Sequence, residues 1–285
     1  MDFRLHSAKS ADHALEIAAS LKDGWRYVAG GTDLVIQLRR GVRKSDDLID
    51  LSSIASMQGI KEDGNGFELG VLCTHKDIEL HEGLSAAYPA LRAAARVVGG
   101  HQIRNVGTVG GNLANASPAA DVAVALLALD ALIGAKGSNG SREIKIDDLF
   151  VSSSKTTLAP GELIEHVRLA TPVVKTHSAF LKVGRRKAME ISVVSAAICL
   201  AFGANDICEK ARIALGAVGP RPLRAKAAER LLEGAEIDAG LIARAAAQAR
   251  AECSPRSDPR ASAAYRSKVV EGLVMRGISQ CVGVS

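Results

Sequence analysis

Two pairs of adjacent glycines constrain the possible folds of this chain more than any other feature of its sequence. Gly30–Gly31 lies between the apolar run 25–28 and a Thr-Asp pair, and Gly110–Gly111 lies between Thr108-Val109 and an asparagine. Adjacent glycines permit positive φ and let backbone N–H groups converge on an anion. A helical pattern follows each pair, and the N-terminus of a helix favours phosphate oxygens. Both segments are therefore candidate anion-binding loops.

A single segment of this kind is also compatible with an ordinary strand-to-helix turn, in which Thr32 and Asp33 cap the helix. Two such segments in one domain can hold the two halves of a diphosphate. Neither is followed by the Lys-Ser/Thr of a Walker motif, and neither is Gly-x-Gly-x-x-Gly. The second absence argues against a Rossmann nicotinamide site.

The composition is that of an ordinary soluble protein and excludes several function classes. Hydrophobic residues make up 47% and charged residues 24% of the 285 residues. The net charge of +5 is spread along the chain without a Lys/Arg-rich run, so no nucleic-acid partner is expected. Aromatic residues make up only 3%, so no stacking platform for single strands is available. A basic surface still suits an anionic cofactor.

Cysteine usage and the N-terminal segment predict a cytoplasmic protein. None of the cysteines forms a Cys-x-x-Cys pair or stands near a histidine at zinc-ligand spacing, so no metal site is predicted. An odd number without a signal peptide indicates free thiols in a reducing compartment. Residues 1–10 contain no apolar signal core, and no apolar stretch reaches about 18 residues, so no transmembrane segment is expected. The five cysteines are Cys73, Cys199, Cys208, Cys253 and Cys281.

The order of apolar runs predicts an α+β fold in two parts. In the first part, helical patterns and strand-like runs are mixed. The helical patterns cover 11–21, 34–41, 90–98 and 120–129, and the strand-like runs cover 25–28, 49–51, 67–72 and 163–169, with a hairpin at 131–146. Thr74 and Asp77 resemble a capping box.

The second part has a different pattern. Strand-like runs at 179–183, 193–202 and 211–218 precede three helical patterns that begin near residues 223, 239 and 261. Strands followed by helices are typical of an α+β unit, so we predict a boundary near residues 172–177. The predicted domains are 1–172 and 177–285.

Two charged residues in apolar surroundings are candidate cofactor contacts. Asp121 stands at the start of an apolar helix, which suits either a helix cap or a hydrogen bond to a ribose or ribityl hydroxyl. Lys182 lies in an apolar strand, where a buried ammonium needs an anionic or polar partner. The alternative for Lys182 is a side chain that reaches solvent beside Arg185 and Arg186. The residues alone leave both pairs of interpretations open.

Three motifs, taken together, resemble one known family. They are AGGTD at 29–33, QIRNVGTVGGN at 102–112 and KVGRR at 182–186. In this order and spacing they are similar to the FAD-binding medium subunits of molybdenum hydroxylases, the family of xanthine dehydrogenase and carbon monoxide dehydrogenase. The similarity covers nearly the whole chain. It implies a two-part FAD-binding domain with two glycine-loop subdomains, followed by a smaller C-terminal domain of a sheet plus helices.

The resemblance also implies a role for each matching residue. The two glycine segments would surround the FAD diphosphate and the adjoining ribityl chain, chiefly through backbone N–H groups. Asp121 would hydrogen-bond the cofactor, Ile164 would pack at the flavin, and Lys182 would contact the isoalloxazine edge. A cation there would stabilise the reduced flavin. The predicted cofactor-binding residues are Tyr27, Val28, Ala29, Gly30, Gly31, Thr32, Asp33, Leu34, Thr108, Val109, Gly110, Gly111, Asn112, Asp121, Ile164 and Lys182.

The resemblance further implies partner subunits. A large subunit would carry molybdopterin and a small one two [2Fe–2S] clusters, in a dimer of heterotrimers. Electrons from substrate would cross the clusters to this FAD and leave to NAD⁺, a quinone or another external acceptor. The alternative is a stand-alone FAD oxidoreductase that acts on its own substrate. Against it stands the lack of a catalytic acid–base cluster, because the five histidines considered are scattered, at positions 75, 81, 101, 166 and 177.

Overall fold

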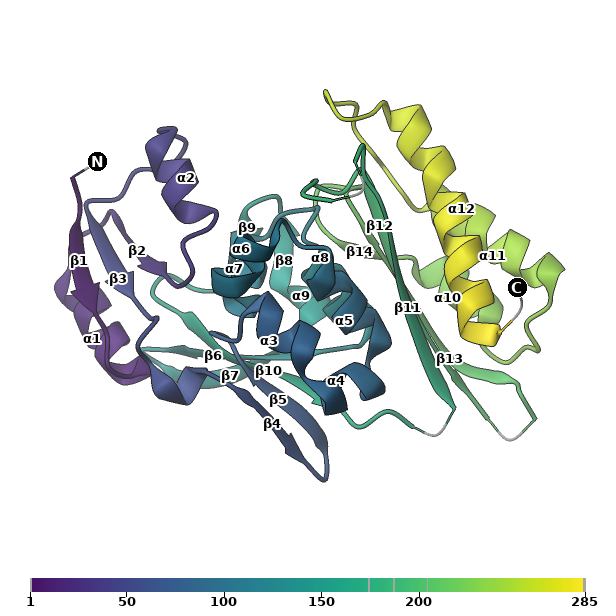
Figure 1. Cartoon of the computed structure of the whole chain (residues 1–285), viewed down its shortest axis with the longest axis horizontal. Helices are drawn as coiled ribbons and strands as arrows, with labels where there is room; N and C mark the ends of the chain where they lie inside the picture. The colour runs from purple at the N-terminus through teal and green to yellow at the C-terminus, as the bar shows by residue number, and fades with distance from the viewer. Residues whose placement is uncertain (1, 174, 187, 204, 284–285) are drawn as a thin grey trace.

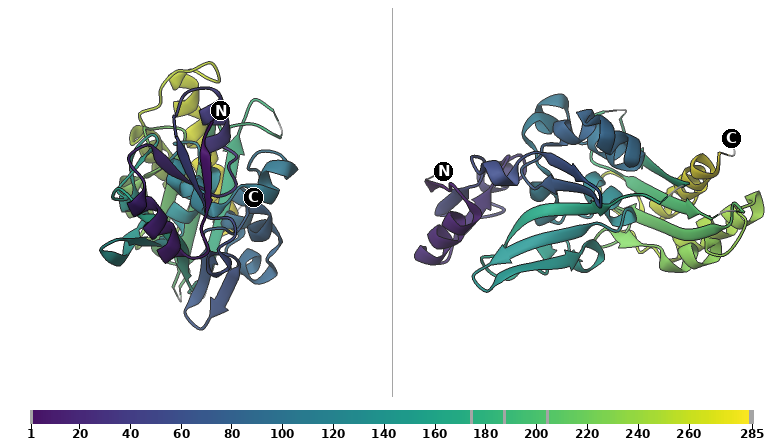
Figure 2. Two further views of the ribbon diagram at one scale, coloured as in Figure 1. Left: turned by 90° about the vertical axis from the view of Figure 1, so that its left-hand side faces the viewer. Right: turned by 90° about the horizontal axis from the view of Figure 1, so that it is seen from below.

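A computed structural model describes residues 2–173, 175–186, 188–203 and 205–283 of the chain. Three sheets follow one another along the long axis of the molecule, and the two termini lie toward opposite ends (Figure 1). The view from below in Figure 2 shows the same sequence of layers. Within the described residues, no helix is long and apolar enough to cross a membrane.

The N-terminal unit is a small parallel sheet with two helices. Its strands have the order β1-β3-β2, and both pairings are parallel. Ser10 accepts a hydrogen bond from the backbone N–H of His13 and caps the first helix. The second helix has no fully buried residue and projects from the sheet (Figure 1). The elements are β1 (Arg4–Ser7), α1 (Ala11–Ser20), β2 (Trp25–Val28), α2 (Leu34–Arg39) and β3 (Asp47–Asp50).

The middle unit is a five-stranded antiparallel sheet with a layer of short helices. The strand order is β4-β5-β10-β6-β7, in which β10 returns between two sequential hairpins. Its strands are β4 (Ile60–Asp63), β5 (Gly66–Gly70), β6 (Leu132–Gly137), β7 (Gly140–Lys145) and β10 (Leu163–Ala170), and β8 (Phe150–Ser152) and β9 (Lys155–Thr156) form a separate ribbon. Its helices are a 3₁₀ turn at Ala55–Met57, α3 (His75–Leu80), α4 (Glu82–Ala87), α5 (Pro89–Arg96), α6 (His101–Val106), α7 (Val109–Asn115), α8 (Asp121–Ala128) and α9 (Ile146–Leu149).

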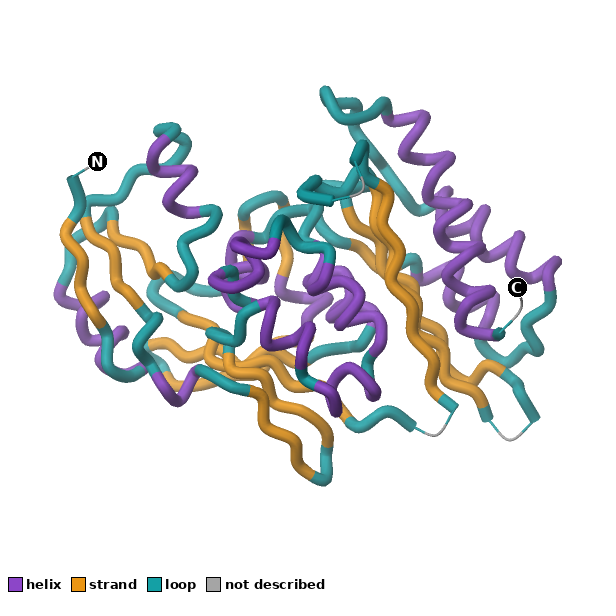
Figure 3. The backbone as a smooth tube through the Cα atoms, viewed as in Figure 1, coloured by secondary structure: helices purple, strands orange, loops and turns teal. Residues whose placement is uncertain are grey.

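The C-terminal unit is a four-stranded antiparallel sheet covered by three helices. Its elements are β11 (Thr176–Val183), β12 (Val194–Phe202), β13 (Cys208–Gly216), β14 (Leu223–Arg224), α10 (Lys226–Leu232), α11 (Ala239–Ala251) and α12 (Ala263–Val282). Helix α12 packs on one face of the sheet, while α5 and α8 of the middle unit pack on the other (Figure 3). The contacts of α5 and α8 with this face of the sheet join the middle unit to the C-terminal unit.

Helix α8 explains how the middle and C-terminal units hold together. All eight of its residues are buried, because it lies between the other helices and strands β12 and β13. A helix that is apolar on every side needs such a position. Two core residues of the C-terminal sheet, Ala197 and Ala214, accordingly belong to the larger hydrophobic core. The predicted α+β class, with a C-terminal sheet plus helices, is confirmed.

Two local expectations need correction. The segment around Gly110–Gly111 is a candidate loop in the sequence, but most of the glycine-rich stretch 106–116 is helical, in α6 and α7. Thr108 caps α7 through a hydrogen bond from the Gly111 N–H, and this cap outweighs the low helix propensity of two glycines. The helix expected from about residue 223 begins at Lys226, because Leu223 and Arg224 pair with β13 as an edge strand.

Candidate cofactor-binding site

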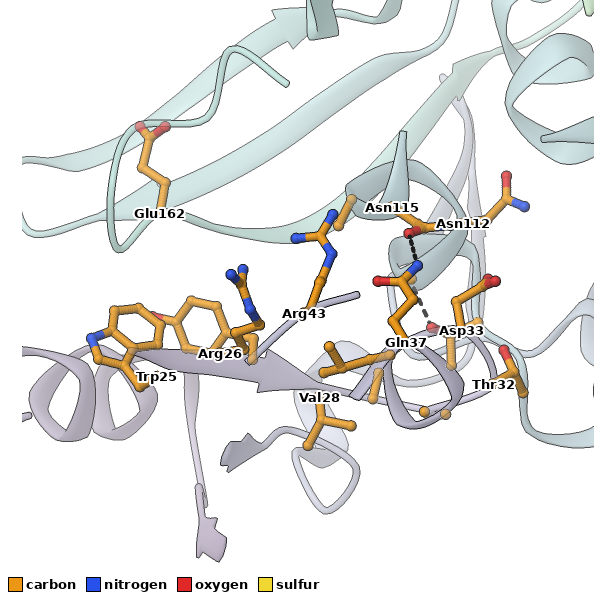
Figure 4. A pocket seen from close by; sticks show the side chains of 18 of the residues that line it. Trp25, Arg26, Val28, Thr32, Asp33, Gln37, Arg43, Asn112, Asn115 and Glu162 are labelled. Carbon is orange, nitrogen blue, oxygen red and sulfur yellow. Dashed lines mark hydrogen bonds between the residues drawn. The ribbon is translucent and has the colours of Figure 1, made fainter. Parts of the chain in front are cut away.

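A long cavity of about 500 Å³ lies between the N-terminal unit and helix α7 (Figure 4). Strand β2 and the start of α2 form one wall, and Thr108 together with residues of α7 forms the other. Trp25 and Arg26 lie at one end of the cavity, and Val98 and Ile103 also line it. Eleven predicted residues line it, namely Tyr27, Val28, Ala29, Gly30, Gly31, Thr32, Asp33, Leu34, Thr108, Gly111 and Asn112.

The first glycine pair has the geometry of an anion-binding turn. Gly31 has a φ of +68°, which favours glycine strongly. A Cβ on Gly30 would lie 1.7 Å from the carbonyl oxygen of Val106, so the two glycine segments approach closely here. The backbone N–H groups of Gly30, Gly31 and Thr32 donate to no other described residue. They are therefore available to a ligand at the start of α2.

The second glycine pair differs from the expectation. Gly110 and Gly111 lie in the first turn of α7, and their N–H groups donate to the Val71 carbonyl and the Thr108 hydroxyl. A Cβ on Gly110 would lie 2.7 Å from Val71 Cβ, whereas one on Gly111 would meet only Thr108 Oγ1, at 3.1 Å. The N–H groups that are available to a ligand thus belong to the first pair. In the second pair, Gly110 packs closely against Val71, and Gly111 leaves space in the cavity wall.

One hydrogen bond links the two walls of the cavity. Gln37 Nε2 of α2 donates to Asn115 Oδ1 of α7 over 3.0 Å (Figure 4). Nearby, Asn112 Oδ1 accepts from the Ala123 N–H at the start of α8, which fixes the orientation of that amide. Asp33 stands before α2 but makes no capping hydrogen bond, so its predicted cap is wrong. Burial raises the pKa of Asp33.

An apolar side pocket opens beside the main cavity. It has a volume of about 110 Å³ and contains Ile164, together with Gly110 and Leu158. Tyr27 and Gly111 line both spaces. The Tyr27 hydroxyl donates to the Gly161 carbonyl over 2.9 Å, and burial raises its pKa to about 12. The side pocket therefore suits a planar apolar ring attached to a group in the main cavity.

Asp121 and Lys182 meet each other behind the cavity wall. Lys182 Nζ donates to Asp121 Oδ2 over 2.7 Å and to the Val97 carbonyl over 3.1 Å, and the next residue, Val98, lines the cavity. The other carboxylate oxygen accepts from Ser192 Oγ at 2.5 Å. Asp121 makes no helix cap, and Lys182 does not extend into solvent, so both of those alternatives are wrong. The anionic partner that a buried lysine needs is present.

Several lining residues were not predicted from the sequence. Val98 is apolar and lies outside the three motifs, Ile103 lies within the motif at 102–112 but was assigned no contact, and Gln37 and Asn115 are 78 residues apart. His75 is only 3% exposed, and burial, with a contribution from Arg104, lowers its pKa from 6.5 to about 4. Val109, which was predicted to contact the cofactor, lies in the core, where its N–H donates to the Cys73 carbonyl.

These residues fit a dinucleotide-type cofactor. Free N–H groups at a helix start suit a diphosphate, the glycines leave room for close approach, and the side pocket suits a ring. No group of three or more metal-ligating side chains occurs in the ranges that the structure describes. The site thus has the features of a nucleotide cradle.

Comparison with known proteins agrees with this geometry. Residues 1–172 match the family of the FAD binding domain in molybdopterin dehydrogenase, and residues 179–281 match the CO dehydrogenase flavoprotein C-terminal domain. The glyceraldehyde dehydrogenase medium chain of Sulfolobus acidocaldarius is 30% identical over 98% of both chains. The carbon monoxide dehydrogenase medium chain of Afipia carboxidovorans is also 30% identical, over 98% of this chain and 96% of its own.

A solved structure shows the same fold. A chain of Cu,Mo-CO dehydrogenase superposes with a TM-score of 0.95 at 29% identity, covering 100% of this chain and 99% of the other. The match extends over both the cavity-bearing region and the C-terminal sheet. The chain therefore belongs to the FAD-binding medium subunits of the molybdenum hydroxylases, the oxidoreductase family of xanthine dehydrogenase and carbon monoxide dehydrogenase.

Proposed function

We propose that this subunit accepts electrons from [2Fe–2S] clusters of a partner subunit and passes them, through its FAD, to an acceptor outside the complex. The main support is the cavity between the two glycine segments, which offers free N–H groups at Gly30 and Gly31. Bound there, FAD supplies the redox chemistry, and the protein supplies binding and electrostatics. The lining residues form no acid–base cluster of the kind that substrate chemistry needs.

In this proposal the diphosphate binds the N–H groups at the start of α2. Thr108, Gly111 and Asn112 approach it from the opposite wall, and one ring of the cofactor packs against Ile164 in the side pocket. Val109 and Gly110 support this wall from the core. The cofactor also contacts the other predicted residues of the first segment that line this wall, namely Tyr27, Val28, Ala29, Thr32, Asp33 and Leu34.

Asp121 and Lys182 act at the end of the cavity beyond Val98. Their hydrogen bond holds the ammonium next to the wall, where it can stabilise negative charge on a reduced flavin. Asp121 keeps the role of a cofactor hydrogen-bonding residue in this proposal. Burial raises the pKa of Asp121, and Lys182 opposes that rise.

The proposed complex contains a large molybdopterin subunit and a small subunit with two [2Fe–2S] clusters, as a dimer of heterotrimers. NAD⁺, a quinone or another external acceptor takes the electrons. All five cysteines are free thiols, which is usual in a reducing compartment, and the proposed location is the cytoplasm. Residues 1–172 are proposed to form the cofactor domain and 177–285 a separate C-terminal domain.

Purification of the tagged chain from its native host tests this function. We expect about one FAD per chain, released as FAD rather than FMN, together with molybdenum and iron in co-purifying subunits. After reduction by dithionite, NAD⁺ or a quinone should re-oxidise the iron–sulfur clusters, and removal of FAD should abolish this re-oxidation. A lone yellow chain that turns over a substrate would instead support the stand-alone oxidoreductase.

A further inference from the structure

Arg26 and Arg43 line the cavity, and neither has an ionic partner among the residues that the structure describes. Arg26 lies in β2, and Arg43 follows α2, where its backbone N–H donates to the Gln37 carbonyl. Figure 4 shows both side chains extending to the same side, into the cavity. Within the described ranges, no carboxylate oxygen lies within 4.0 Å of either guanidinium, and Arg26 Nε is buried without a hydrogen-bond partner. An unpaired buried donor of this kind needs an acceptor.

The acidic side chains around this part of the cavity do not supply that acceptor. Glu162 lines the cavity, but Arg142 binds both of its carboxylate oxygens over 2.8 Å from the outside. Asp23 and Asp33 also line the cavity, but neither forms an ion pair with Arg26 or Arg43 among the described residues. Burial and repulsion by Arg43 lower the pKa of Arg26, as expected for two cations that face one space. Both guanidiniums therefore face the cavity without a carboxylate bound to either of them in the described part of the chain.

The position of this charge relative to the glycine pair indicates the ligand. Gly30 and Gly31 present free N–H groups to the same cavity, and the ring-sized side pocket beside Tyr27 opens onto it. The diphosphate of FAD carries two negative charges on four terminal oxygens, which can accept more hydrogen bonds than a few N–H groups supply. Guanidinium groups bind such oxygens through paired, charge-assisted hydrogen bonds.

We propose that Arg26 and Arg43 form an anion subsite that binds the FAD diphosphate together with the first glycine pair. This inference rests on the proposed position of FAD in the cavity. The two guanidiniums neutralise the two phosphate charges, so they determine affinity for flavin nucleotides over uncharged flavins. They are positioning residues and take no part in electron transfer.

The test is a set of binding titrations on the flavin-free full chain. Dissociation constants for FAD, ADP and riboflavin are measured for Arg43→Gln, Arg26→Gln and the double variant. Each single change should weaken FAD and ADP by about tenfold or more, the value of a charge-assisted hydrogen bond, and leave riboflavin within about twofold. Added salt should weaken FAD binding less in the double variant than in the wild type.

Arg40→Gln is the matched control, since Arg40 is the C-cap that follows α2, is exposed and does not line the cavity. It removes the same charge and should leave all three constants unchanged. The midpoint of thermal unfolding of each variant shows whether it folds as the wild type does. If Arg26→Gln disturbs β2, Arg43→Gln in the following turn is decisive by itself.

The outcomes separate the subsite from the proposed function. An unchanged FAD constant in Arg43→Gln and the double variant, or an equal loss for riboflavin, would overturn the subsite. A wild-type chain that binds no FAD would contradict the proposed position of FAD and the arginine proposal based on it. ADP binding that still depended on both arginines would then support an anion subsite for another nucleotide.

Discussion

The ammonium of Lys182 lies 2.7 Å from a carboxylate oxygen of Asp121, and this buried ion pair joins the C-terminal sheet to the first residue of α8. The side chains are 13% and 5% exposed. Lys182 also holds the carbonyl of Val97, next to the cavity wall. One lysine thus connects the two halves of the chain and the proposed flavin end of the site, so a change there should affect both stability and redox behaviour.

Lys182→Met should destabilise the chain by about 3–5 kcal/mol, because it leaves the Asp121 carboxyl buried without a cation. The double variant Lys182→Met with Asp121→Asn should regain most of this loss, since no buried charge remains. Chemical denaturation of both variants and of Asp121→Asn completes the cycle. Losses that simply add in the double variant would contradict a direct interaction.

The same variant tests the proposed electronic role. If the ammonium stabilises negative charge at the flavin, Lys182→Met should make the flavin harder to reduce, and about 1.4 kcal/mol corresponds to a tenfold change in the equilibrium for reduction. Turnover with an acceptor that draws electrons upstream of the flavin should persist, while NAD⁺- or quinone-linked turnover falls. A redox titration that gives the wild-type potential would leave Lys182 a purely structural residue.

Local features of the fold could be predicted from the sequence because the determinants lie a few residues apart. The Ser10 cap and the capping box of Thr74 and Asp77 are both present. The hairpin at 131–146 also forms, with Gly137 paired to Gly140. The motifs at 29–33, 102–112 and 182–186 identify the family because their order and spacing are specific to it. The glycine-rich composition of 106–116 favours a loop, but the packing of Gly110 against Val71 and the Thr108 cap stabilise a helix there.

The rest of the site depends on contacts between residues distant in sequence. Lys182 and Asp121 are 61 residues apart, and no periodicity predicts that they pair. Arg26 and Arg43 look like ordinary solvated arginines in the sequence, since only the fold shows that they face one cavity. Val98 is one apolar residue among many, and its place in the wall follows from the turn after α5.

Gly111→Ala and Gly110→Ala should have different effects although the residues are adjacent. A Cβ on Gly111 meets only a hydroxyl oxygen at 3.1 Å, so the chain should fold normally and bind FAD more weakly. A Cβ on Gly110 lies 2.7 Å from Val71 Cβ, so overpacking should lower stability by about 1–3 kcal/mol. Unfolding curves and flavin content of the two variants check this. Equal stability of both would show that the contact with Val71 is relaxed easily.

Asp130 joins the end of α8 to the C-terminal sheet through Arg212 and Arg224, both at 2.7 Å. Burial acts to raise its pKa, but the two arginines prevail and lower it to about 2. Asp130→Asn keeps a residue that tolerates its positive φ, and should cost about 1–3 kcal/mol because Arg224 is nearly buried.

Asp206→Asn is the matched control for that change. Asp206 also has positive φ and also forms an ion pair, with Lys175, but on the surface. Its loss should cost between about 0 and 1 kcal/mol. Thermal or urea unfolding compares the two variants, and similar losses would mean that Asp130 contributes no more than a surface pair does.

His75 should make the stability of the chain depend on pH between about 4 and 6.5. Its buried imidazole has a pKa lowered to about 4, chiefly by burial and also by Arg104, whereas the unfolded chain takes up the proton near 6.5. As the pH falls below 6.5, the unfolded state binds the proton first, so stability decreases until about pH 4. Above 6.5 both states are neutral and this contribution is constant. The gap corresponds to roughly 3 kcal/mol.

His75→Phe keeps a ring in the wall and removes the titration. Urea unfolding at several pH values should show that the variant lacks the part of the slope between pH 4 and 6.5 that the wild type has. His177→Phe, a change at an exposed histidine, should retain the wild-type slope. If the His75→Phe slope matched that of the wild type, the imidazole would have to reach water or find a partner on protonation. The wall of the cavity at His75 would then open more readily than its 3% exposure indicates.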